Sequence, residues 1–104
     1  MEVIKRVFFT GYSQLAGRPG DLYVMRKNNC WHINAGVDSC GHNPGFGVDF
    51  DVVDGTPESV SFEEFFEQTA RVQRFVINEL GATQQSCNGI FEEIWGYMQQ
   101  KNAE

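Results

Sequence analysis

The stretch 48-VDFDVVDGTPESVSFEE-64 decides the fold, because within it the hydrophobic repeat changes from that of a strand to that of a helix. Val48–Val53 alternates apolar and acidic residues with a period of two, which predicts a strand with one core face and one acidic, solvated face. The turn-forming residues Asp54–Pro57 should end that strand. Ser61–Glu64 then fits a capping box, in which the serine caps the first helical turn and the glutamate reaches back to it.

Apolar residues recur at helical spacing after this stretch. They predict one helix from Ser61 to Leu80, with Gly81 as its C-terminal stop. A second helix is predicted from Gln84 to about Gln100, where apolar residues follow each other three and four positions apart. Asn88-Gly89 weakens its first turn, so a later start near residue 90 is the alternative.

Three further strands are predicted before the stretch, at Val3–Thr10, Leu22–Arg26 and Cys30–Asn34. Lys27-Asn28-Asn29 should join the last two as a tight hairpin, since asparagine tolerates the left-handed backbone that such a turn needs. Alternation along the third strand places Trp31 in the core.

Two glycine-rich segments predict irregular loops. Ser13–Gly20 contains two glycines and a proline, which excludes a regular element. Gly36–Gly47 contains four glycines and a proline, and loops of this length are often functional or mobile. The second loop is therefore a candidate for a ligand site.

Strands gathered before helices predict a single α+β domain over residues 1–104: an antiparallel sheet of about four strands, followed by two C-terminal amphipathic helices packed on one face (β-β-β-β-α-α). Such a sheet has exposed edges that favour a homodimer or a partner strand. No apolar run is long enough for a membrane span or a signal peptide, so we expect a cytoplasmic protein without membrane contact.

Acidic residues are concentrated in the middle of the chain. The 104 residues contain 14 Asp and Glu against 8 Lys and Arg, and the window Asn28–Ala70 has no Lys or Arg. This charge argues against nucleic acid as a partner and favours a basic protein, although acidity for solubility alone is the alternative. The candidate contact residues are Asp49, Asp51, Asp54, Glu58, Glu63, Glu64 and Glu67.

Two Cys-x-His pairs, Cys30/His32 and Cys40/His42, contain the ligand types of a zinc site. Their spacing does not match common zinc modules, so we expect no metal and no cofactor. The same residues, oriented by Asp38 or by Asp49, could form a thiol enzyme. Signatures of catalytic cysteines are absent, and no catalytic residue is assigned.

In size and charge balance the chain resembles toxin-immunity proteins and small anti-defence proteins of mobile elements. This resemblance is of a general type. It implies a small acidic protein-binding protein, an inhibitor that neutralises a basic nuclease or another nucleic-acid-handling protein. The alternatives are a structural or small-ligand-binding homodimer of a mobile element, and a Cys/His metal or thiol enzyme.

Overall fold

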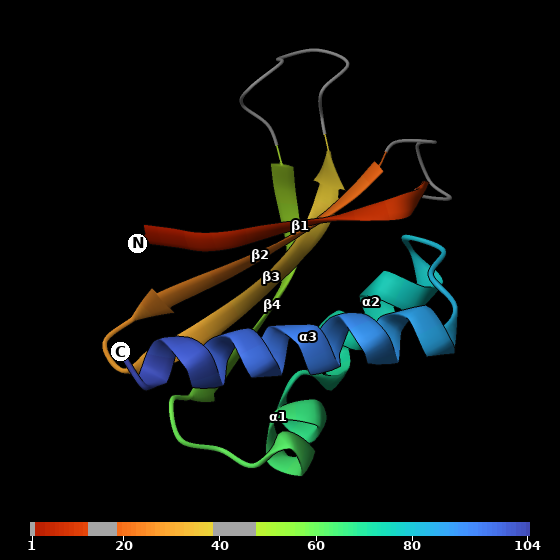
Figure 1. The fold of residues 1–104 in the computed structure, drawn as a ribbon. Helices are drawn as coiled ribbons and strands as arrows, with labels where there is room; N and C mark the ends of the chain where they lie inside the picture. Colours follow the sequence, from red (N-terminus) through yellow and green to blue (C-terminus); the bar gives the residue numbers. More distant parts are fainter. Residues whose placement is uncertain (1, 13–18, 39–47) are drawn as a thin grey trace.

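The computed structural model describes the backbone of residues 2–12, 19–38 and 48–104, and the side chains of residues 22–36 and 52–104. The elements in these segments are β1 (Glu2–Tyr12), β2 (Pro19–Lys27), β3 (Cys30–Asp38), β4 (Val48–Pro57), α1 (Phe62–Gln68), α2 (Ala70–Asn78) and α3 (Gln84–Asn102). The strands form one antiparallel sheet in the order β1-β2-β3-β4 (Figure 1). The predicted α+β class, with an antiparallel sheet before the helices, is confirmed.

The core lies between one face of the sheet and the helices, with α3 running across that face (Figure 1). Trp31 and Ile33 on β3 are fully buried, as the alternation predicts. Their neighbours Cys30 and His32 point to the other, helix-free face and are half-buried. The fully buried side chains of the helices are Phe65, Val72, Val76, Cys87, Phe91, Ile94 and Met98.

The predicted hairpin between β2 and β3 is present. Asn28 and Asn29 have φ angles of 54° and 61°, and Lys27 pairs with Cys30 on either side of them. Two consecutive left-handed residues make the tight turn whose twist matches that of paired strands.

β4 is longer than predicted, because the turn-like residues at its end belong to the strand. Thr56 pairs with Trp31, and Pro57 pairs with Cys30 at the first position of β3. A proline is tolerated in this last position, where a missing N–H costs little. Tertiary pairing with β3 therefore overrides the local turn signal.

The two predicted loops are only partly described. Pro19 and Gly20 belong to β2, and residues 13–18 lie outside the described part of the chain. Gly36 to Asp38 extend β3 beyond the predicted end at Asn34, and residues 39–47 lie outside it as well.

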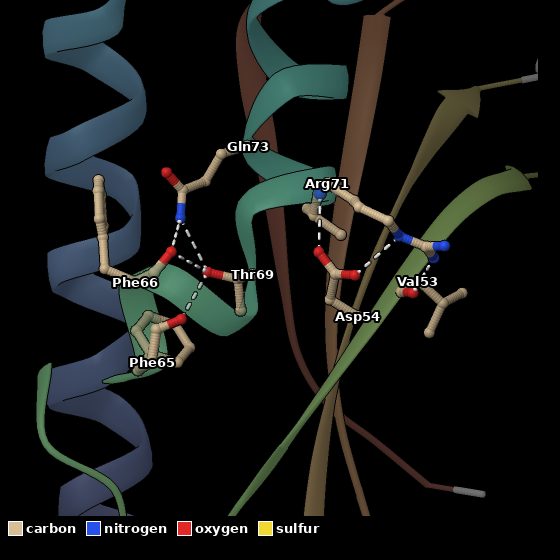
Figure 2. A network of polar contacts seen from close by, with 8 residues as sticks. Val53, Asp54, Phe65, Phe66, Thr69, Arg71 and Gln73 are labelled. Carbon is tan, nitrogen blue, oxygen red and sulfur yellow. Dashed lines mark hydrogen bonds and ion pairs between the residues drawn. The ribbon is translucent and has the colours of Figure 1, made fainter. Parts of the chain in front are cut away.

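The helix predicted from Ser61 to Leu80 is two helices, α1 and α2, which meet at Thr69. The Thr69 hydroxyl donates to the Phe65 carbonyl at 2.8 Å. The Gln73 amide donates to the Phe66 carbonyl at 2.6 Å and to the Thr69 hydroxyl at 2.9 Å (Figure 2). These side chains satisfy carbonyls of the last turn of α1, which stabilises the break.

The predicted stop at Gly81 and the predicted start of the last helix at Gln84 are both confirmed. Gly81 has φ 83°, the left-handed conformation expected after a helix. α3 begins at Gln84, not near residue 90, because the Thr83 hydroxyl accepts the backbone N–H of Ser86 at 3.0 Å. This N-terminal cap offsets the weak helix propensity of Asn88-Gly89.

Candidate functional site

Three of the predicted contact residues, Glu63, Glu64 and Glu67, are exposed on α1, and we call them the α1 acidic surface. Glu64 completes the predicted capping box: its backbone N–H donates to the Ser61 hydroxyl at 3.1 Å, and its carboxylate accepts the Ser61 N–H at 3.4 Å. Glu63 and Glu67 are one turn apart on one side of the helix. Within the described side chains, neither has a cationic partner.

Aromatic packing holds α1 against α3. The Phe62 ring lies 5.7 Å from that of Trp95 in an edge-on arrangement, and the buried Phe65 ring lies 6.1 Å from that of Phe91. The Trp95 indole N–H donates to the Val60 carbonyl at 3.4 Å, just before α1 begins. The α1 acidic surface is therefore carried by a firmly packed helix, although α1 has only 7 residues.

Asp54, another predicted contact residue, is buried, and its carboxylate is bonded to other residues of the chain. It is 8% exposed, and its carboxylate accepts the backbone N–H of Val72 at 2.8 Å and the Arg71 Nε–H at 3.1 Å (Figure 2). The Arg71 guanidinium also donates to the Val53 carbonyl at 2.6 Å. This carboxylate stabilises the start of α2.

Glu58 is likewise paired within the chain. Its carboxylate accepts the Arg26 Nε–H at 2.7 Å, and the Arg26 guanidinium lies 5.2 Å from the centre of the Trp31 ring. An ion pair of this kind lowers the local negative charge. The remaining candidates, Asp49 and Asp51, belong to β4 by their backbone, and their side chains lie outside the described part of the chain.

The sequence did not indicate which carboxylates are paired with a cationic side chain within the fold and which are exposed without one. Arg26 and Arg71 are 32 and 17 residues from the carboxylates that they bind, so no local spacing indicates these pairs. The break between α1 and α2 does have a signal in the sequence, because Thr69 is a polar residue within an otherwise apolar helical stripe.

The described residues include one of the two Cys-x-His pairs, Cys30 and His32. Cys30 and His32 share the helix-free face of β3, whereas Cys40 and His42 lie outside the described residues.

The described side chains contain no group of three or more potential metal ligands. The carboxylates of the α1 acidic surface are exposed to solvent, where negative charge attracts cationic groups.

Comparison with protein-family models, with curated protein sequences and with solved structures finds no match to this chain. Among the described residues, no helix combines the length and the apolar character needed to cross a bilayer.

Proposed function

We propose that the protein acts by binding a basic protein partner through the α1 acidic surface. The class of activity that fits best is an inhibitor or immunity-type protein that neutralises a basic nuclease or another nucleic-acid-handling protein. The supporting observation is that Glu63 and Glu67 are exposed and lack a cationic partner among the described side chains, whereas Asp54 and Glu58 have one.

The physical basis is competition for a phosphate-binding cleft. Carboxylates accept the same charge-assisted hydrogen bonds from Arg and Lys that phosphates accept. Unpaired surface charges also speed the encounter with an oppositely charged protein, and salt weakens this effect. Phe62 and Phe65 pack α1 against α3, so the backbone of α1 is already ordered before binding. Binding through the carboxylates of α1 therefore costs little backbone conformational entropy.

The test is affinity capture from the source cell's lysate at low salt, with elution by a salt step and identification by mass spectrometry. The bait is compared with the double variant E63K/E67K and with a control, E79K/E92K, that changes the net charge by the same amount at the end of α2 and on α3. We expect a basic protein that the control captures and E63K/E67K does not. Equal capture by both variants, or an empty eluate from the unchanged bait, would overturn the proposal.

A homodimer formed through a strand edge, the alternative, has less support. The edge strand β4 has its Val53 carbonyl occupied by Arg71. The other edge strand, β1, has register shifts between Val3 and Lys5 and between Phe8 and Tyr12. Bulges and edge-blocking charges are the usual protections against strand addition.

A further inference from the structure

An aromatic surface lies beside the α1 acidic surface. Phe62 and Phe66 are one turn apart on α1 with their ring centres 5.5 Å apart, and the Phe62 ring lies 5.7 Å from that of Trp95 on α3. All three side chains are half-buried. Phe62 and Trp95 pack against the buried core, whereas among the described residues the Phe66 ring contacts only the ring of Phe62. Phe66 is thus a large apolar side chain that the described fold leaves partly uncovered.

Helix geometry places Phe66 next to two carboxylates of the α1 acidic surface. Glu63 precedes Phe66 by three positions and Glu67 by four, so Glu63 is a neighbour of both on the helix surface. Among the described side chains, no cation lies over the Phe66 ring, and none pairs with Glu63 or Glu67. An aromatic ring and two carboxylates therefore lie together at the surface of one helix.

Elsewhere in the same fold, an arginine joins a ring and a carboxylate of this kind. The Arg26 guanidinium lies 5.2 Å from the centre of the Trp31 ring, and its Nε–H donates to the Glu58 carboxylate at 2.7 Å. A lysine can also take the position over a ring, since Lys101 lies 5.8 Å from the centre of the Tyr97 ring. The ring and the carboxylates of α1 are the two halves of such an arrangement that a cation from another molecule would join.

We propose, as a consequence of the proposed function, that the basic partner is recognised through an arginine side chain. Its guanidinium packs on the Phe66 ring, and its N–H groups donate to the carboxylates of Glu63 and Glu67. Arginine can do both at once, because its flat guanidinium stacks on an aromatic face while its five donors point outward in the plane. The ammonium of lysine is compact and more strongly hydrated, so it gains less from the ring.

The test compares two glycine-rich peptides of equal length and charge, which carry either arginine or lysine at the same positions. Each peptide is titrated into the isotope-labelled full chain at low salt, and NMR shift changes give the dissociation constant and locate the contact. We expect both peptides to shift resonances of α1. The arginine peptide should bind about 2–5-fold more tightly, which is the factor that an exposed cation–π contact provides.

The decisive variant is Phe66→Leu, which removes the aromatic face and keeps an apolar side chain of high helix propensity. We expect this variant to bind the arginine peptide no more tightly than the lysine peptide, with its affinity for the lysine peptide unchanged. Phe75→Leu, at another half-buried phenylalanine on α2, is the matched control and should retain the preference. Circular dichroism and thermal unfolding check that both variants are folded.

Three results would overturn this proposal: no binding of the arginine peptide, equal affinities of the unchanged chain for the two peptides, or a preference that survives in Phe66→Leu. The lysate capture separates it from the proposed function. If a basic protein is captured through Glu63 and Glu67 while the two peptides bind equally, only the arginine preference is wrong. If the peptides behave as expected and no basic protein is captured, the proposed function is wrong and the preference of the surface stands.

Discussion

The Asp54 carboxylate of β4 accepts the backbone N–H of Val72, in the first turn of α2, at 2.8 Å. Thr69, the residue at the N-terminal cap position of α2, makes no cap bond with its side chain; its hydroxyl donates to the Phe65 carbonyl and accepts the Gln73 amide N–H. The sheet thus supplies the cap that the helix lacks. One carboxylate couples the position of α2 to that of β4.

Asp54→Ala should therefore destabilise the fold strongly. It leaves the buried Val72 N–H without a partner and releases Arg71, and we expect a loss of about 2–3 kcal/mol in the free energy of unfolding. Asp54→Asn keeps an acceptor for Val72 and should cost less than the alanine variant. Urea unfolding followed by circular dichroism measures both losses, and equal losses for the two variants would argue against the capping role.

Asn102 joins the end of α3 to the sheet. Its side chain accepts the Trp31 indole N–H at 3.0 Å and donates to the Glu58 carbonyl at 2.7 Å. Asn102→Ala should lower the free energy of unfolding by about 1–2 kcal/mol and shift the tryptophan emission, since two part-buried bonds are lost. The exposed Asn78→Ala is the matched control, and a comparable effect of that control would contradict the assignment.

Asn34 should be replaceable with a gain in stability. It is 8% exposed on the helix-free face, and within the described structure its Oδ1 atom has no hydrogen-bond partner. Asn34→Val removes this unsatisfied acceptor and adds a residue favoured in strands, so we expect an increase of about 1 kcal/mol in the free energy of unfolding. A decrease in the urea midpoint would show instead that the amide has a role in the folded state.

Because of Cys87, the free energy of unfolding should depend on pH in the alkaline range. Burial raises the pKa of its thiol from 9.0 to about 11. Between these values the unfolded chain loses the proton and the folded chain keeps it, so the stability contribution is present below pH 9 and declines as the pH rises towards 11. Cys87→Ala is less stable at neutral pH because of the cavity, yet its stability should fall less steeply over this interval. The measurement is the free energy of unfolding as a function of pH for the unchanged chain and for Cys87→Ala. An equal decline in both proteins would refute the prediction.

Short-range features of the fold could be predicted from the sequence. The Asn28-Asn29 turn, the Ser61 capping box and the burial of Trp31 each depend on residues that lie close together in the chain. The α+β class follows from the order in which strand and helix periodicities occur. These signals are local, so no tertiary contact had to be known.

Features that depend on distant contacts could not be predicted. Thr69 is a polar position in the apolar stripe, but only the hydrogen bonds of Thr69 and Gln73 in the folded structure show that α1 ends there. Gly55 and Pro57 are typical turn residues, and only their pairing with β3 shows that they belong to a strand. For the candidate site, the sequence indicates that acidity is concentrated, but the pairing of Asp54 with Arg71 appears only in the folded structure.

The order of the elements also bears on how the protein is made. The four strands precede all three helices in the chain, so the apolar face of the sheet is covered in steps, by α1 and α2 and last by α3, whose Asn102 bonds to Trp31. From Pro57 to Asn102 is 102 − 57 = 45 residues. At about 5–20 residues per second, synthesis of these residues takes roughly 2–9 s. The apolar face of the sheet is covered completely only at the end of that interval.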